Sequence, residues 1–277
     1  LGDVYKRQLY QEHTGRYFNH NVHSVRVLDD MVNWNISLQT LDGILCHNGE
    51  LELKEYRPCE MSTFVEYDKK VEACYVDENA IGELIPCTLE GCVMRICDII
   101  AYLGKDRQDA MRLNLLKESP FTAGAIGTSN GEIINNFSVN IIENSYGKDY
   151  LKMDEEYFDA LRQAKKENYE MIYNNKSLND LYENEIRPMF GELYEELLRQ
   201  AESGDKSSVF YRHHMAYMEK NNFYVKSHVR KPYAEQEKNQ LVVDYLASMT
   251  DDYFIALYHY LFPKGKHDVK FVGYFDL

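Results

Sequence analysis

Apolar residues recur with helical spacing through most of the chain. Between residues 20 and 32, apolar side chains return at every third position: Val22, Val25, Leu28 and Met31. This spacing is typical of one face of a helix. Similar patterns predict further helices over residues 38–45, 90–116, 155–173, 179–200 and 234–262, with a break near 249–250, and a helix or an extended piece over residues 133–144. The chain is therefore predicted to be all-α.

Two stretches lack this periodicity. Residues 48–88 are rich in Glu, Pro, Tyr and Asp, and we expect a long loop that contains short helices. The segment 122–131 is small and Gly-rich, which indicates a turn or loop. Asp154 stands just before the helix predicted at 155–173, where its side chain is suited to cap the first amides.

The composition fits a globular protein and argues against some partners. Charged residues make up 27% of the 277 residues, and the formal net charge is −14. A general nucleic-acid binder needs a basic face, so nucleic acid is an improbable partner, whereas a nucleotide substrate is not excluded. No run of about 18 apolar residues occurs, and no signal peptide is evident, so we expect no membrane segment. Six cysteines without a C-x-x-C pair favour reduced thiols and a cytoplasmic location.

The start of the chain is unusual. Residues 3–8, DVYKRQ, resemble the translation of a transposon mosaic end that is used to prepare sequencing libraries, and the chain has no initiator Met. We interpret residues 1–8 as a cloning or assembly scar. The natural protein is then expected to continue upstream, and the chain to be a fragment.

Three polar residues stand out on the helix predicted at 90–116. Asp98, Tyr102 and Asp106 follow one another at intervals of four, which places them on roughly one face. Asp98 lies within an apolar run, where a carboxylate is costly unless it is paired or bound to a metal. From the spacing alone, a salt bridge, for instance with Arg95, and a metal site both stay open. Gly104 is expected to weaken this helix locally by about 1 kcal/mol relative to Ala.

Four segments resemble one known family in its own order. Residues 95–110, RICDIIAYLGKDRQDA, resemble the "aDdIaYl..DieDa" helix of the HD-type deoxynucleoside triphosphate (dNTP) triphosphohydrolases. Residues 18–26, FNHNVHSVR, are similar to the family's "FeHNxQSlR" motif, and residues 41–48, LDGILCHN, to the helix that follows it. Residues 243–253, VDYLASMTDDY, are similar to its late "DYIaGMTDryA" segment.

The resemblance implies a fold and a domain layout. It implies an HD-domain helical bundle with a C-terminal helical extension. Residues 9–118 would be the C-terminal part of the HD domain, and residues 119–277 a helical C-terminal region packed on it. Relatives are usually homo-oligomers, so a homo-oligomer is expected here as well.

The resemblance also assigns separate roles to the polar residues. Asp98 would be the last ligand of the family's His…His-Asp…Asp site for a divalent metal, Mn²⁺, Mg²⁺ or Fe²⁺. Tyr102 would pack against the deoxyribose, and Asp106 would accept a hydrogen bond from its 3′-OH. Further substrate contacts are expected near the phosphates and at the sugar or base, from Asn21, His47 and Tyr173.

One part of the family pattern is missing. The first His, the His-Asp pair and the "GHpPFGHxGE" segment precede the "HN" motif in the family, and this chain does not contain them. The catalytic residues are therefore unknown and expected upstream, and the chain alone is expected to be inactive.

The resemblance predicts hydrolysis of dNTPs to a deoxynucleoside and inorganic triphosphate by the intact enzyme. The alternatives are another HD-type nucleotide phosphohydrolase, such as a monophosphatase or cyclic-nucleotide phosphodiesterase, and a non-catalytic nucleotide-sensing protein on the same scaffold. We interpret two remaining basic groups, His213-His214 and the patch Lys226, His228, Arg230 and Lys231, as solvated surface.

Overall fold

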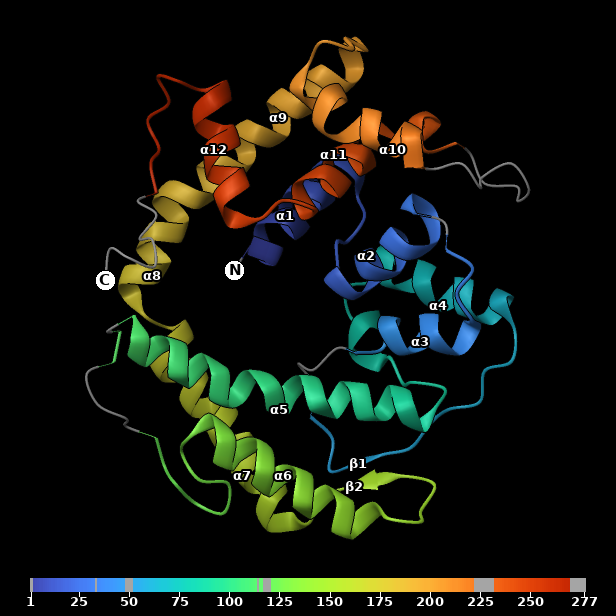
Figure 1. Cartoon of the computed structure of the whole chain (residues 1–277), viewed down its shortest axis with the longest axis vertical. Helices are drawn as coiled ribbons and strands as arrows, with labels where there is room; N and C mark the ends of the chain where they lie inside the picture. The colour runs from blue at the N-terminus through green and yellow to red at the C-terminus, as the bar shows by residue number, and fades with distance from the viewer. Residues whose placement is uncertain are drawn as a thin grey trace. The chain divides into compact units, whose positions relative to one another are not determined.

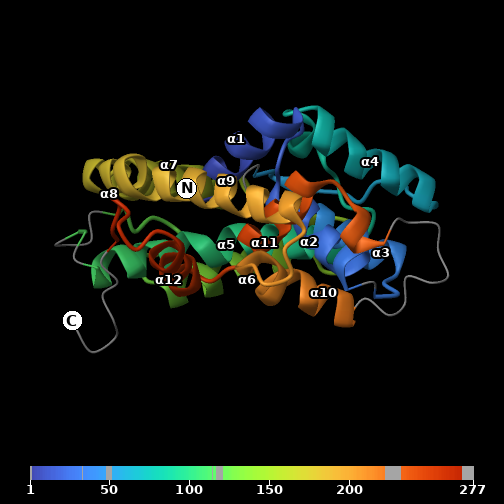
Figure 2. The ribbon, with the colours of Figure 1, turned by 90° about the horizontal axis from the view of Figure 1, so that it is seen from above.

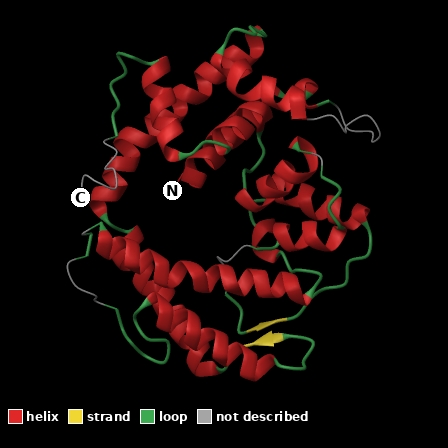
Figure 3. Cartoon of the chain, viewed as in Figure 1, coloured by secondary structure: helices red, strands yellow, loops and turns green. Residues whose placement is uncertain are grey.

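The computed structural model describes residues 2–32, 34–47, 52–113, 115–116, 121–221 and 232–269. These residues are predominantly helical, as Figure 3 shows, so the predicted all-α class is confirmed. The strand pair among them joins β1 (Glu55–Tyr56) to β2 (Leu151–Lys152) in antiparallel register, with Tyr56 opposite Leu151.

The structure contains two compact units. The first unit comprises Leu1–Asn35 and Asp180–Leu277, and the second comprises Ile36–Asn179. These units are defined by contacts within each of them. The predicted HD-domain range and C-terminal range concern family boundaries, and they stay predictions.

Helix α5 is the centre of the second unit. It spans Leu89–Arg112, and its N-terminus is capped by Thr88, whose hydroxyl accepts a hydrogen bond from the Gly91 amide at 3.0 Å. In Figure 1 and Figure 2, α5 lies beside α6 (Asn130–Ser145), and it also packs on α7 (Glu155–Asn168). The buried side chains of these three helices form one apolar core, which includes Ile96, Ile99, Ile100, Leu103, Ile133, Phe137 and Leu161.

Gly104 serves the packing of α5 on α6. A Cβ at this position would lie 2.7 Å from the Cα of Asn130 and 2.5 Å from its Oδ1. The glycine therefore allows the start of α6 to approach the backbone of α5. The sequence suggested only the cost of a glycine within a helix, whereas the structure shows what it makes room for.

The other helices of the second unit come before α5. Helix α3 (Leu38–Leu45) has the predicted bounds, and α4 (Phe64–Val76) lies within the predicted loop region, followed by a 3₁₀ turn at Ala80–Glu83. A capping box begins α4: Thr63 accepts from the Glu66 amide, and Glu66 accepts from the Thr63 amide. The expectation of short helices in this loop is confirmed over its described residues.

The first unit is built from both ends of the chain. Helix α9 (Arg187–Ser203) packs on α11 (Lys238–Ala247), and α1 (Gly2–Thr14) packs on both. Their buried residues include Leu193, Leu197 and Leu241. The unit is completed by α2 (His20–Arg26), α10 (Ala216–Asn221) and α12 (Asp251–Leu261). The short α8 (Lys176–Leu181) spans the boundary between the units.

Two predicted helices end in a wider turn. Helix α2 continues as a π-helical turn at Val27–Met31, and α7 continues as one at Tyr169–Tyr173. Such turns are frequent at functional positions. The second turn carries Tyr173, one of the predicted contacts. Among the described residues, no helix combines the length and apolar character that crossing a membrane requires.

Candidate functional site

The three polar residues of the sequence motif lie on one helix, α5. The buried residues of α5 face the core of the second unit, whereas Asp98 and Asp106 are half-buried and Tyr102 is 60% exposed. One continuous helix therefore carries all three residues, as their spacing predicted, and their side chains point away from the core.

Asp98, Tyr102 and Asp106 form a polar stripe on α5, and Tyr173 contacts it. Its phenolic hydroxyl donates a hydrogen bond to Oδ2 of Asp106, from a position 67 residues further along the chain. Burial raises the pKa of the Asp106 carboxyl, and the hydrogen bond from Tyr173 opposes that rise. Burial, and then the bond to Asp106, raise the pKa of the Tyr173 phenol. The structure thus brings together two residues that the resemblance assigned separately, Asp106 to the sugar and Tyr173 to the sugar or base.

A buried clamp holds α7 against α5 next to this pair. Arg107, which is 3% exposed, donates from Nε to Oδ1 of Asn168 at 2.8 Å and from Nη2 to Oε2 of Glu167 at 3.1 Å. Asn168 in turn donates to the Leu103 carbonyl at 3.0 Å. Because Asn168 directly precedes the π turn, this clamp fixes the turn that presents Tyr173. Arg107, Glu167 and Asn168 were not predicted from the sequence. The sign of their role was a charged residue, Arg107, at a core-facing position of α5.

Arg95, the salt-bridge partner considered for Asp98, takes part in the core. It is buried, its guanidinium donates to the Leu84 carbonyl, and it lies 5.9 Å from the centre of the Tyr56 ring.

The other two predicted contacts come from other parts of the chain. His47 follows α3, is half-buried, and its Nδ1 lies 2.5 Å from the Ile44 carbonyl oxygen. Asn21 belongs to α2 in the first unit and is 1% exposed; its Nδ2 has no hydrogen-bond partner among the described residues. The second unit therefore holds five of the six predicted residues, and Asp106 and Tyr173 are the pair that a hydrogen bond joins.

The metal predicted for Asp98 needs more ligands than the described residues offer. Among them, no group of three or more His, Cys, Asp or Glu side chains is placed to hold a metal ion. Asp98 supplies one carboxylate of the expected four ligands, so these residues do not make a complete metal centre, and the metal stays a prediction.

The first unit contains a buried polar network that the sequence analysis missed. Asp244 of α11 accepts two hydrogen bonds from Arg26 of α2, at 2.8 Å to Oδ1 and 2.7 Å to Oδ2. Tyr233 and Gln240 each donate to it at 2.9 Å. Although burial would raise the pKa of Asp244, the charge and hydrogen bonds of Arg26 hold it below its usual value. This pair joins the segment 18–26 to the segment 243–253, two of the family-like motifs.

His214 also belongs to this network, so its interpretation as solvated surface is wrong. It is buried, and its Nε2 lies 2.7 Å from the Tyr233 hydroxyl. Burial lowers the pKa of His214 to about 4. His213 is exposed as predicted and contacts the Tyr253 hydroxyl at 2.7 Å. The basic patch of Lys226, His228, Arg230 and Lys231 lies outside the described residues.

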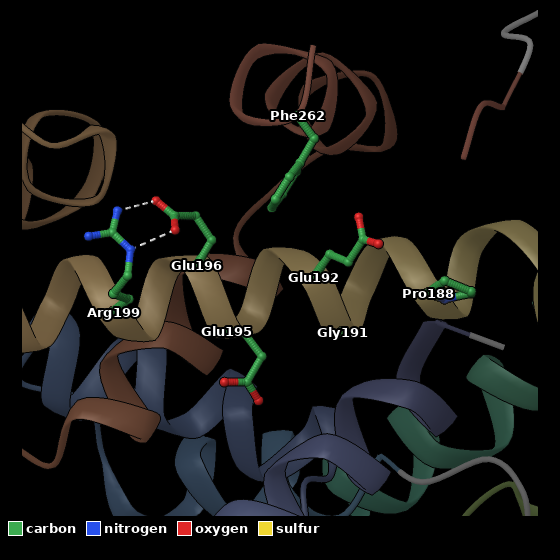
Figure 4. A pocket seen from close by; sticks show the side chains of 7 residues that line it. All are labelled: Pro188, Gly191, Glu192, Glu195, Glu196, Arg199 and Phe262. Carbon is green, nitrogen blue, oxygen red and sulfur yellow. Dashed lines mark hydrogen bonds and ion pairs between the residues drawn. The ribbon is translucent and has the colours of Figure 1, made fainter. Parts of the chain in front are cut away.

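A pocket of about 780 Å³ on the first unit has the wrong charge for a nucleotide. Figure 4 shows Glu192 and Glu196 on the side of α9 that faces Phe262, and Glu195 also lines the pocket. Its one arginine, Arg199, donates from Nε and Nη2 to Glu196 at 2.8 and 2.6 Å. The three carboxylates outnumber the one arginine and would repel phosphates, so the polar stripe on α5 is the better candidate.

Comparison with known proteins supports the family suggested by the motifs. Residues 151–260 match the model of the phosphohydrolase-associated domain. Relatives described as deoxyguanosinetriphosphate triphosphohydrolase-like proteins come from Clostridium perfringens strain SM101 (26% identity, 85% of this chain and 58% of that protein) and Clostridium tetani (25% identity, 89% and 60%). The chain is therefore similar to dGTPase-like proteins over most of its length, at low identity.

A third dGTPase-like relative, from Caldanaerobacter subterraneus subsp. tengcongensis, is 27% identical over 64% of this chain and 47% of its own length. The chain spans about half to three-fifths of the length of these curated relatives. No solved structure matches the chain. Two contacts described above cross the edge of the range that matches the phosphohydrolase-associated domain. Tyr173 and Asp244 lie inside this range, whereas their partners Asp106 and Arg26 precede it.

Proposed function

We propose that this chain is the part of a dNTP triphosphohydrolase that recognises the deoxynucleoside. The observation that carries the proposal is the hydrogen bond between Tyr173 and Asp106 beside the exposed ring of Tyr102. Oδ1 of Asp106 has no partner among the described residues, so it is available to accept a hydrogen bond from a sugar 3′-OH. The ring of Tyr102 would pack against the sugar.

In this proposal the phosphates and the metal lie toward the Asp98 end of the stripe. Asp98 would contribute one carboxylate ligand to Mn²⁺, Mg²⁺ or Fe²⁺, and the metal would polarise phosphate and activate water. The sequence resemblance also implies that Asn21 and His47 contact the phosphates. A homo-oligomer and a cytoplasmic location remain part of the proposal.

The products of the whole protein test this function. Incubated with dGTP and Mn²⁺, the protein that contains this chain should release deoxyguanosine and inorganic triphosphate, which ³¹P NMR distinguishes from other phosphates. Asp98→Ala should abolish the release, because it removes a metal ligand. Asp109→Ala, which changes a neighbouring exposed carboxylate bonded to Lys105, serves as the control and should stay active.

Other products would favour the alternatives. Pyrophosphate or single phosphate would identify another HD-type phosphohydrolase. Binding of dGTP without any turnover by the whole protein would identify a nucleotide sensor.

A further inference from the structure

We propose that Tyr169 stacks on the nucleobase of the deoxynucleotide, an inference that rests on the proposed function. Tyr169 lies at the end of α7, where the π-helical turn begins, and it is 60% exposed. Within the described part of the chain, no hydrogen bond or ion pair engages its side chain. The ring is therefore accessible to a ligand, and its place beside the polar stripe on α5 indicates which part of a nucleotide it meets.

The elements that carry Tyr169 and the polar stripe run in the same direction. Asn168 of α7 donates to the Leu103 carbonyl of α5 at 3.0 Å, and Tyr173 donates to Asp106. The residue numbers thus rise together along both elements. A residue one turn before Tyr173 is therefore level with the residue one turn before Asp106.

The π-helical turn directs Tyr169 toward the same side as Tyr173. The Asn174 amide donates to the Tyr169 carbonyl at 2.9 Å, a bond that spans one residue more than the bonds of an α-helix do. Side chains four residues apart differ in direction by about 40° in an α-helix, and the wider turn makes this difference smaller. Because Tyr173 reaches Asp106, Tyr169 is directed to the preceding turn of α5, which presents Tyr102.

Three tyrosine rings therefore gather beside Asp106. Tyr102 and Tyr169 are each 60% exposed, and Tyr173 is 46% exposed. After burial and the bond to Asp106, the nearby Tyr102 also raises the pKa of the Tyr173 phenol, so these two side chains are close together. Exposed aromatic faces of this kind are surfaces on which proteins stack nucleobases, whatever the base, because every base has a π-face.

The shape of a nucleotide favours Tyr169 as the contact of the base. In the proposed function the phosphates lie toward Asp98 and the 3′-OH lies at Asp106, so the sugar backbone follows the polar stripe. The base leaves the sugar to one side of this line. On the side of α7 it meets Tyr169, whereas on the opposite side α5 presents Ala101 and Lys105, which have no aromatic ring.

Two ligands with and without a base test this contact on the whole protein that contains this chain, in Ca²⁺ without turnover. One ligand is dGTP, and the other is the abasic 1′,2′-dideoxyribose 5′-triphosphate, which keeps the 3′-OH and the phosphates. Tyr169→Ala should raise the Kd of dGTP about tenfold and leave the Kd of the abasic ligand unchanged, because only base stacking is lost. Tyr169→Phe keeps the ring and should bind both ligands as the wild type does.

Two more variants complete the test. Tyr146→Ala is the matched control, since Tyr146 directly follows α6 and is 88% exposed, and it should leave both Kd values unchanged. Tyr169→Leu keeps an apolar side chain on the turn but has no aromatic face, so it should weaken dGTP binding as Tyr169→Ala does. It decides the question if the alanine variant fails to fold.

Three results would overturn the role of Tyr169: equal Kd values of the two ligands in the wild type, an effect of Tyr169→Ala that is absent or the same for both ligands, and a loss in Tyr169→Phe as large as in Tyr169→Ala. The proposed function would still stand in these cases if Asp106→Ala removed the preference for dGTP over 2′,3′-dideoxy-GTP. A wild-type protein that binds no dGTP would overturn both.

Discussion

Replacing Arg26 with Met leaves the buried carboxylate of Asp244 without its bidentate partner. Removing one partner of a buried ion pair costs about 3–5 kcal/mol. Tyr233 and Gln240 continue to donate to Asp244, so we expect the lower end, about 3 kcal/mol. The Arg26→Met, Asp244→Asn double variant leaves no unpaired charge. Its loss of unfolding free energy should therefore be about 2 kcal/mol smaller than the sum of the losses in the two single variants.

The free energy of unfolding is measured by urea titration under reducing conditions, with circular dichroism at 222 nm. Arg199→Met is the matched control: Arg199 also makes two hydrogen bonds to one carboxylate, that of Glu196, but at an exposed position, so the control should be indistinguishable from wild type. The comparison requires equal m-values in all variants.

The dependence on pH has a defined sign. The folded pKa of Asp244 is depressed, so the ion pair stabilises the fold above the unfolded pKa and the stabilisation is lost as pH falls through the folded value. Arg26→Met raises the folded pKa. The stability gap between wild type and variant should therefore be widest near neutral pH and narrow in acid. A gap below about 1 kcal/mol at pH 7, or one that does not change with pH, would show that Arg26 does not stabilise the ionised Asp244 in the fold.

Two further predictions concern single positions. The pKa of His214 is lowered to about 4, below the unfolded value near 6.5, so the chain should lose on the order of 3 kcal/mol of stability as pH falls between these values. His214→Gln should remove this loss, as urea titrations at pH 7 and 4.5 will show; an unchanged acid loss would contradict the assignment. Gly104→Ala should destabilise the fold by about 1–3 kcal/mol because its Cβ would meet the Asn130 backbone, whereas Gly131→Ala should be neutral or slightly stabilising. Equal effects on the thermal midpoint would show that α5 and α6 do not approach as described.

Local structure was largely predictable. The bounds of α3 coincide with the predicted helix, and Asp154 caps α7 through the Tyr157 amide as expected. These features depend on neighbouring residues, so the sequence carries them directly. The π turns after α2 and α7 were not predicted, because apolar spacing does not distinguish them from regular helix.

Long-range pairing was not predictable from periodicity. Arg26 and Asp244 stand 218 residues apart, and neither residue type is expected in a core. Asp106 and Tyr173 were each predicted to contact substrate, but only the fold brings them together. The packing role of Arg107 was not predicted, because it depends on hydrogen bonds to Glu167 and Asn168 of another helix. The family resemblance suggested residues, and the structure shows which side chains contact them.

In the proposed function, Asp106, which accepts a hydrogen bond from Tyr173, also accepts one from the 3′-OH of a deoxynucleotide. The most direct test compares the Kd of dGTP with that of 2′,3′-dideoxy-GTP, for the whole protein and its Asp106→Ala variant, without turnover in Ca²⁺. The wild type should bind dGTP about tenfold more tightly than the dideoxy analogue, because the hydrogen bond goes to a charged acceptor, and the variant should lose this preference. An equal preference for dGTP in both proteins would contradict it.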